Sequence, residues 1–259
     1  MGSEQSESSM PLRVVTAAAI FDGHDVAIGI FRRILQSQGC EVIHLGHDRG
    51  ADEVARAAIQ EDAHAIAITS YQGGAVEMFT HTKQILDEAD FGHVFLFGGG
   101  GGTILPNEIK HLDESGIARI YSPDDGRELG LVGMVQDAME GASKSDLLES
   151  SRFDFLSGTI TADDHGAVSK LLTLSENGNE DTFSATLERV RSRPADESCP
   201  VVGLTGTGGA GKSSLTDEIM LRIQRDNPGM KIALLALSLI HISEPTRPLY
   251  SSYAVFCLK

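Results

Sequence analysis

Apolar runs and amphipathic stretches alternate along residues 12–139 of this 259-residue chain. Some runs have the length and composition of buried strands, and these are Leu12–Ile20, Glu41–Leu45, Ala65–Thr69, His93–Phe97 and Ile117–Tyr121. Apolar residues recur at helical spacing after each run, in Val26–Gln38, Ala51–Glu61, Val76–Glu88, Pro106–Glu114 and Gly126–Met139. Strands that alternate with helices indicate a parallel sheet covered on both faces. We therefore predict an α/β fold with a flavodoxin-like, doubly wound, five-stranded sheet.

The composition changes after this domain, to which we assign residues 12–142. Residues 143–199 are rich in Ser, Glu, Asp and Asn, so we expect them to be a linker. Two short helical patterns interrupt this stretch, around Ala167–Ser175 and Thr182–Arg191. Residues 1–11 are polar and acidic, and we expect them to form a disordered tail.

A phosphate-binding pattern follows the linker. The run Gly206-Thr207-Gly208-Gly209-Ala210-Gly211-Lys212-Ser213 matches G-x-x-x-x-G-K-[ST], between a predicted strand, Pro200–Thr205, and an amphipathic helix, Ser214–Arg225. In this pattern backbone N–H groups hold phosphates, the lysine reaches the β and γ oxygens, and the hydroxyl ligates Mg²⁺. The nucleotide-binding candidates are Gly206, Gly208, Gly209, Ala210, Gly211, Lys212, Ser213 and Ser214, with Ser213 as the Mg²⁺ ligand.

The end of the chain does not continue this second module. Lys231–Leu237 has the pattern of a second strand, but Ser238–Lys259 has neither a helical nor a strand period. Leu239–Pro248 looks like a translated sequencing adapter, so we expect residues 238–259 to be a non-native tail. Residues 200–237 would then be a truncated P-loop module, which is too short to bury a core of its own.

Charge narrows the possible partners, and cysteine content narrows the possible cellular compartment. The net charge of −16 disfavours binding to nucleic acid or to an anionic membrane. The three cysteines, Cys40, Cys199 and Cys257, are odd in number and widely spaced, which fits a reducing compartment such as the cytoplasm. No apolar run is long enough to span a bilayer.

Candidate chemistry follows three of the predicted strands. Asp22-Gly23-His24 comes after the first, Ser70 after the third, and the run Gly98–Gly102 after the fourth. Loops at the carboxyl ends of parallel strands meet at one edge of the sheet, where ligands bind. His24 is either a metal ligand oriented by Asp22 or a surface histidine beside acids that cap a helix. The glycine run either admits a bulky ligand or is a surface loop.

Two other ligand classes fit these loops poorly. A phospho-receiver domain needs an acidic residue at the end of the third strand, where Thr69 and Ser70 stand. A flavodoxin needs a phosphate-binding loop after the first strand, where Asp22 and Asp25 would repel a phosphate.

The Asp-x-His pair, the loop serine and the glycine run, in this order, resemble the B12-binding domain of adenosylcobalamin-dependent acyl-CoA mutases. They are most similar to the fused isobutyryl-CoA mutase family, in which a P-loop GTPase module follows this domain. The resemblance implies that His24 is the lower axial ligand of cobalt and that Asp22 sets the tautomer of its imidazole. It also implies a cofactor-binding set of Asp22, Gly23, His24, Asp25, Ser70, Gly98, Gly99, Gly100, Gly101 and Gly102.

In that set the serine hydrogen-bonds the benzimidazole tail of the cofactor, and two of the glycines let the tail pass. Two positions depart from the family pattern, since Ala27 replaces a glycine and Gln72 replaces a leucine. The resemblance covers about residues 12–142.

The resemblance implies a parent enzyme that interconverts isobutyryl-CoA and n-butyryl-CoA by radical rearrangement, with adenosylcobalamin, GTP and Mg²⁺ as cofactors. The acyl-CoA would bind a barrel domain that these residues lack, and the full-length protein would be a homodimer. We expect no catalytic residue, no mutase activity and no GTP hydrolysis in these 259 residues. The alternatives are a methylmalonyl-CoA mutase-type protein, a methyl-carrying corrinoid protein, and a flavodoxin-like regulator without cobalamin that is fused to an NTPase.

Overall fold

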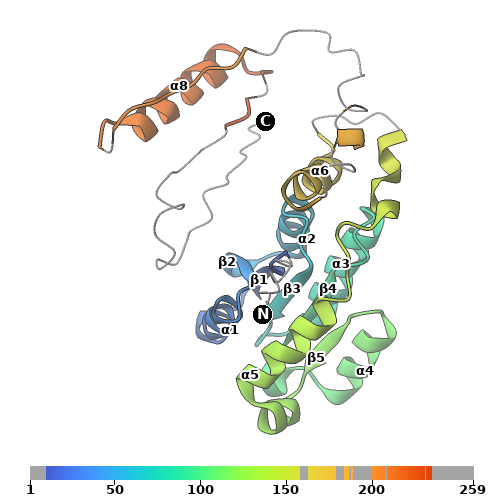
Figure 1. Ribbon diagram of the computed structural model, residues 1–259. Helices are drawn as coiled ribbons and strands as arrows, with labels where there is room; N and C mark the ends of the chain where they lie inside the picture. The colour runs from blue at the N-terminus through green and yellow to red at the C-terminus, as the bar shows by residue number, and fades with distance from the viewer. Residues whose placement is uncertain are drawn as a thin grey trace, which may run out of the picture. The chain divides into compact units, whose positions relative to one another are not determined.

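Five parallel strands make the sheet of the first part of the chain (Figure 1). The computed structural model describes residues 10–157, 163–178, 184–186, 188, 200–207, 209–230 and 232–234. The chain separates into two units, residues 1–194 and 195–259. The strands are β1 (Arg13–Ala19), β2 (Glu41–Arg49), β3 (Ala65–Thr69), β4 (Phe95–Gly99) and β5 (Arg119–Tyr121). Their order, β2-β1-β3-β4-β5, is the predicted doubly wound order, so the predicted fold class is confirmed.

Helices cover both faces of this sheet (Figure 1). They are α1 (Asp25–Ser37), α2 (Ala51–Gln60), α3 (Ala75–Glu88), α4 (Pro106–Glu114) and α5 (Pro123–Ala142). Successive side chains of a strand point to opposite faces, and β3 shows how this builds two cores. Ile66 and Ile68 pack in the cluster that includes α2, α3 and α4, whereas Ala65 and Ala67 pack in the cluster that includes α1 and α5.

The element limits differ from the sequence prediction at two places that matter for the site. β2 continues past Leu45 to Arg49, because its last residues still pair with β1. α5 begins at Pro123 rather than Gly126, because Ser122 and Asp125 form a capping box. The Asp125 N–H donates to Ser122 Oγ (3.2 Å), and the Ser122 N–H donates to Asp125 Oδ2 (2.8 Å).

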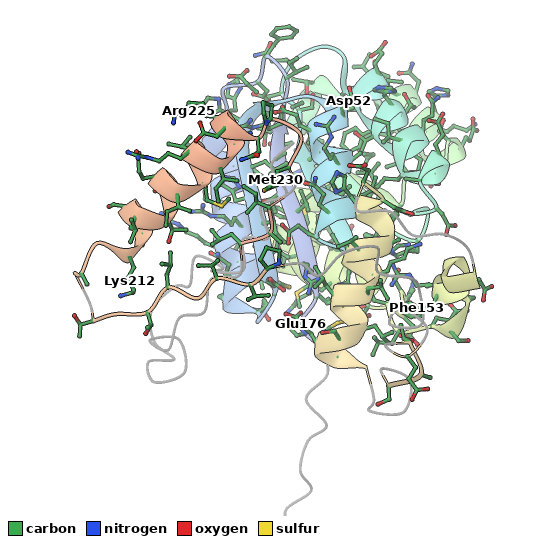
Figure 2. The ribbon with its side chains drawn as sticks, turned by 90° about the horizontal axis from the view of Figure 1, so that it is seen from above. Asp52, Phe153, Glu176, Lys212, Arg225 and Met230 are labelled. Carbon is green, nitrogen blue, oxygen red and sulfur yellow. The ribbon has the colours of Figure 1, made fainter. Side chains whose placement is uncertain are left out.

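Residues that follow α5 belong to the first unit and pack against its earlier elements, where we expected a linker. This segment contains the 3-10 helix η2 (Ser150–Ser157) and the helix α6 (His165–Asn177), and Figure 1 shows α6 beside α2. Ser169 Oγ of α6 donates to the carbonyl of Ile59 (2.6 Å). Glu176, which Figure 2 labels at the end of α6, pairs with Arg13 (3.6 Å). The difference from the prediction arises because composition does not reveal which polar side chains find buried partners. The second expected helix of the linker, Thr182–Arg191, lies mostly outside the described residues.

A buried ion pair anchors this segment. Arg152 Nη2 lies 2.6 Å from Asp62 Oδ1, and the two side chains are 9% and 0% exposed. Arg152 Nη1 also donates to the carbonyl of Leu147 (2.6 Å). A buried ion pair is stable only when further hydrogen bonds satisfy its remaining groups, and breaking it leaves a charge without a partner. The pair therefore fixes η2 to the turn that precedes β3.

Two histidines beside this pair are held neutral. Burial, followed by the positive charge of Arg13, lowers the pKa of His64 to about 4. Burial, followed by the positive charge of Arg152, lowers the pKa of His93 to about 4. His64 Nδ1 accepts the Arg13 N–H (3.0 Å), a bond that requires this nitrogen to be unprotonated.

The second unit contains one long helix, α8 (Lys212–Asp226), within the described residues; Figure 2 labels its first residue, Lys212. The strand predicted at Pro200–Thr205 is not formed, and Val201 and Val202 are 94% and 80% exposed. A strand needs a neighbour to pair with, and no sheet forms among the described residues of this unit. Of the second predicted strand, Ile232 makes a single bridge, and Lys231 and residues 235–237 lie outside the described residues. In the part of the chain that the structure describes, no helix is both long and apolar enough to cross a membrane.

The stability of the first unit should fall as pH decreases between about 6.5 and about 4. In this window the unfolded chain binds protons at His64 and His93 that the folded chain excludes, so each histidine removes up to about 1.4 kcal/mol per pH unit. Urea unfolding at about pH 7 and about pH 5 measures the difference. His64→Asn keeps an acceptor for the Arg13 N–H and should flatten the profile, whereas exposed His111→Asn should not. An unchanged profile in the His64 variant would contradict this account.

Candidate functional site

A tight turn delivers the first candidate residues to the carboxyl edge of the sheet. The Asp22 N–H donates to the carbonyl of Ala19, the last residue of β1, at 3.0 Å. Phe21 stands in the turn with a positive φ of 64°. This reversal sends the Asp22 side chain inward, where it is 0% exposed.

The Asp22 carboxylate is the most fully bonded group of the site. Its Oδ1 accepts the His24 N–H (2.9 Å) and lies 2.7 Å from His24 Nδ1, and its Oδ2 accepts the Tyr71 N–H (2.6 Å). Burial opposes ionisation of Asp22, but the N–H groups of Tyr71 and His24 and the His24 imidazole outweigh it, so the pKa of this carboxyl lies below its ordinary value. One buried anion therefore joins the loop after β1 to the loop after β3.

The His24 imidazole faces solvent on its other side. Its side chain is 62% exposed, and its ring lies 5.3 Å from the Tyr71 ring, tilted by 48°. An ionised Asp22 accepts a hydrogen from Nδ1, which fixes the tautomer and leaves the lone pair on Nε2. Among the described residues, no group of three or more His, Cys, Asp and Glu could hold a metal ion. The geometry thus offers a single, oriented nitrogen ligand and not a complete metal site.

The loops after β3 and β4 lie against each other. The Ser70 N–H donates to the carbonyl of Gly99 (3.0 Å), and Thr103 Oγ1 donates to the carbonyl of Ser70 (3.0 Å). Ser70 is 1% exposed, and its hydroxyl donates to the carbonyl of Gln72 at 3.4 Å. The Ser70 side chain is therefore turned toward its own loop.

Three of the five consecutive glycines are required by this close approach. A Cβ atom at Gly98 would lie 1.9 Å from the carbonyl oxygen of Ile68, and one at Gly100 would lie 1.8 Å from that of Ser70. A Cβ atom at Gly99 would lie 2.7 Å from the carbonyl oxygen of Tyr121. Gly101 has a positive φ of 58°, whereas Gly102 has open space around it. The structure thus assigns most of the run to backbone packing, which the sequence could not distinguish from contact with a ligand.

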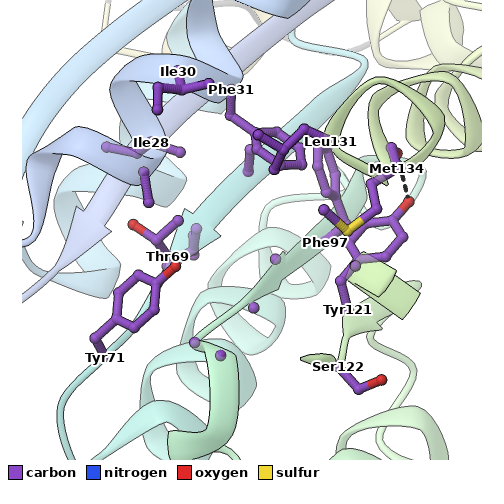
Figure 3. Close-up of a pocket in the computed structure, with 18 of the residues that line it drawn as sticks. Ile28, Ile30, Phe31, Thr69, Tyr71, Phe97, Tyr121, Ser122, Leu131 and Met134 are labelled. Carbon is purple, nitrogen blue, oxygen red and sulfur yellow. Dashed lines mark hydrogen bonds between the residues drawn. The ribbon is translucent and has the colours of Figure 1, made fainter. Parts of the chain in front are cut away.

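An apolar cavity of about 300 Å³ opens beside these loops (Figure 3). Its walls come from α1, the ends of β3 and β4, and the start of α5. The residues that line it are Ala27, Ile28, Ile30, Phe31, Ala67, Ile68, Thr69, Tyr71, Phe97, Gly98, Gly99, Gly100, Gly101, Tyr121, Ser122, Pro123, Gly126, Leu131 and Met134. Such a volume, with few polar groups, is typical of a preformed site for part of a small organic ligand.

Small residues of the sheet make room for this cavity. Ala67 of β3 faces α1 and α5 and lines the cavity, at a position where a larger side chain would fill the space. α5 is kinked at Gly130, whose φ of 65° and ψ of 174° are not helical. Tyr121 holds the far wall, because its hydroxyl donates to the carbonyl of Met134 at 2.9 Å (Figure 3).

One polar atom on the wall has no partner. Thr69 Oγ1 is buried and makes no hydrogen bond within the described part of the chain, and Figure 3 shows its side chain near Tyr71 at the cavity. A buried hydroxyl without a partner is costly, and it marks a place where a ligand can supply the missing bond.

The structure brings the predicted loops together and adds residues that the sequence did not single out. Asp22, Gly23 and His24 share one loop, and the loops that hold Ser70 and the glycines lie beside it, at the predicted edge. The sequence missed the contributions of α1 and α5 to the cavity, and it singled out Ser70 where the structure places Thr69 on the wall. Strand alternation could have found Thr69, since it falls on the same face of β3 as Ala67. The Asp25 side chain lies outside the described part.

The phosphate-loop candidates form a separate group in the second unit. Gly211 and Gly209 have positive φ values of 79° and 73°, and α8 begins directly after Gly211. Lys212 Nζ donates to the carbonyls of Gly206 (2.8 Å) and Thr207 (2.7 Å). The remaining candidates are Gly208, which lies outside the described residues, and Ala210, Ser213 and Ser214, which are exposed. A lysine folded back on its loop at the start of a helix is compatible with a phosphate site.

Comparison with known proteins relates the first unit to a family. Residues 12–127 match the B12 binding domain family. The chain is 48% identical over 227 residues to the fused isobutyryl-CoA mutase of Cupriavidus metallidurans, which covers 87% of this chain and 20% of the relative. It is 45% identical over 241 residues to that of Geobacillus kaustophilus, which covers 87% of this chain and 21% of the relative. The chain thus spans about a fifth of the length of these relatives.

A shorter relative is covered over most of its own length. The chain is 33% identical over 98 residues to the 2-hydroxyisobutanoyl-CoA mutase small subunit of Aquincola tertiaricarbonis. This match covers 38% of the chain and 70% of the small subunit.

Gly100→Ala should destabilise the first unit, and Gly102→Ala should not. The new Cβ atom at position 100 meets a carbonyl oxygen that cannot move without shifting β3, and we expect a loss of about 2–4 kcal/mol in the free energy of unfolding. The Cβ atom at position 102 meets no atom within 4 Å, so this variant is the matched control. Urea unfolding measures both, and equal stabilities would show that the glycine run is not needed for backbone packing.

Proposed function

The chain belongs to the B12 binding domain family, and on that premise we propose that its first unit binds cobalamin as part of a carbon-skeleton mutase. The observation that carries the proposal is the pairing of His24 with a fully buried Asp22. A histidine that binds a metal usually donates its other ring N–H to a carboxylate, which fixes the ring and raises its basicity. His24 has this arrangement, and its Nε2 is available to ligate a metal ion that a macrocycle already holds.

The residues present fit such a cofactor. Cobalt accepts imidazole as a ligand, and a cobalamin needs only one nitrogen from the protein at its lower face when its own benzimidazole is displaced. The apolar cavity between α1, β3 and α5 would hold the displaced benzimidazole tail. Thr69 Oγ1, the polar atom without a partner on its wall, would supply a hydrogen bond to a ring nitrogen of the tail.

In this assignment the protein binds and orients, and the cofactor carries the difficult chemistry. When bound, adenosylcobalamin supplies a radical by homolysis of its cobalt–carbon bond. His24 would ligate the cobalt, Asp22 would keep the imidazole proton on Nδ1, and the cavity beside the glycine loop would hold the tail. No residue of this chain is assigned to contact an acyl-CoA.

The parent activity that we propose is the interconversion of isobutyryl-CoA and n-butyryl-CoA. The match to fused isobutyryl-CoA mutases covers 87% of this chain, so it extends well beyond residues 12–127. A methyl-carrying corrinoid protein is the alternative for the first unit by itself. The phosphate-binding pattern at residues 206–213 favours the mutase, because a methyl carrier has no evident use for a nucleotide-binding module.

The phosphate-binding pattern supports a further proposal for the second unit. We propose that residues 206–214 bind the phosphates of GTP, with Lys212 on the β and γ oxygens and Ser213 on Mg²⁺. The lysine would exchange its bonds to the carbonyls of Gly206 and Thr207 for bonds to phosphate. The full-length protein would be a cytoplasmic homodimer that carries the acyl-CoA site in a further domain.

Binding of cob(II)alamin should place the His24 imidazole on cobalt. The test is electron paramagnetic resonance of the complex with the protein labelled by ¹⁵N, which should change the axial superhyperfine pattern. His24→Ala should abolish this change, and Asp22→Ala should lower affinity about 10–100-fold, as loss of such a partner usually does. His47→Ala, which removes an exposed histidine paired with Asp48, is the control. A pattern that labelling leaves unchanged would mean that the cofactor keeps its own base.

Thr69→Val should weaken cobalamin binding about 2- to 10-fold, since a hydrogen bond to a buried group is worth about 0.5–1.5 kcal/mol. The variant keeps the shape of the side chain and removes a hydroxyl without a protein partner, so the fold should lose no stability. Ser70→Ala is the matched control, because the Ser70 hydroxyl donates to its own loop. Spectral titration with hydroxocobalamin measures all three proteins. A larger effect at Ser70 than at Thr69 would reverse the assignment of the tail contact.

A further inference from the structure

Phe21 combines two unfavourable features directly beside the candidate site. Its side chain is 80% exposed, and its φ of 64° lies in the left-handed region. The other non-glycine residues with positive φ in the described part of the chain are Asp48, Asp62 and Asp90, a residue type that tolerates this region. A bulky aromatic residue does not, and it adopts the region only where the surrounding structure enforces it.

The fold does not require phenylalanine at this position. The turn from Ala19 to Asp22 needs a residue with positive φ, and glycine would supply it without strain. At 80% exposure the ring adds little to the core, so it offsets neither the strain nor the cost of apolar surface in water. A conformational outlier of this kind beside a binding site is a reason to look for a function.

Two further exposed apolar residues stand close to Phe21 and His24 in the chain. Ile20 is 46% exposed and Val26, in the first turn of α1, is 71% exposed. His24 lies between them in the chain, with its imidazole 62% exposed. Exposed apolar residues on both sides of one polar ligand are typical of a segment that a partner or ligand covers.

We propose that Phe21 is a positioning residue that packs against the lower face of the corrin macrocycle and keeps water from the bond between His24 and cobalt. This inference rests on the proposed function, since it assigns the occupant of the surface from the ligand that His24 would hold. A macrocycle held by His24 would cover the residues on either side of it. The left-handed turn has two effects, because the same reversal buries Asp22 and turns Phe21 outward.

Exclusion of water would strengthen the hydrogen bond that orients His24. The hydrogen bond between Asp22 and His24 is stronger where water cannot compete for either group. Phe21 therefore acts through His24 and takes no part in the chemistry.

The decisive variant is Phe21→Gly, studied in the 259-residue chain. Glycine prefers the observed backbone conformation, so the melting temperature should equal or exceed that of the parent chain. Loss of the aromatic contact should weaken binding of hydroxocobalamin about tenfold in a spectral titration. With cob(II)alamin, the fraction of bound cofactor that shows ¹⁵N-dependent axial coupling should fall as well. Phe21→Ala should show the same losses.

Leu172→Ala provides the control, because Leu172 is an apolar residue of α6 that is 45% exposed. It should leave affinity and axial coupling unchanged. If the parent chain binds cobalamin through His24 and Phe21→Gly binds equally well with equal coupling, the role of Phe21 is refuted while the proposed function stands. If the parent chain shows no histidine ligation, the proposed function fails, and the role of Phe21 fails with it.

Discussion

One buried carboxylate determines the arrangement of the candidate site. Asp22 is inaccessible to solvent, and an anion in that position is stable only when hydrogen-bond donors replace the water that it has lost. Its partners are two backbone N–H groups and the His24 imidazole, drawn from the loops after β1 and β3. The orientation of His24, the position of Tyr71 and the outward direction of Phe21 all depend on this one group.

The cavity depends on a second constraint, which is the size of side chains on one face of the sheet. Ala67, on the α1 and α5 side of β3, lines the cavity with a side chain too small to fill it. Tyr121 and Met134, which share a hydrogen bond, line the far wall of this space. Large residues pack on the opposite face of the same strand.

Charge is used differently at the two ends of the first unit. At the carboxyl edge, the ionised Asp22 orients a histidine whose second nitrogen is accessible. In the cluster that joins Asp62, Arg152 and His93, the ion pair is buried and the histidine is neutral, and they attach a segment of chain instead of a ligand. Both arrangements use a carboxylate and an imidazole, and solvent access to the imidazole distinguishes a site from a structural contact.

The sequence by itself determined the order of strands and helices, because periods of two and of 3.6 residues follow directly from backbone geometry. It also indicated that Asp22 and His24 lie close together, since residues two positions apart on one loop are neighbours in any fold. Only the tertiary structure decided that Thr69 lines the cavity where the sequence pointed to Ser70, that α1 and α5 complete its walls, and that Gly98 and Gly100 are needed for contact with β3. It likewise decided that Arg152 and α6 pack where composition predicted a linker. The physical reason is the same in each case: these features depend on which side chains and backbone atoms meet across distant parts of the chain, and local periodicity carries no record of such contacts.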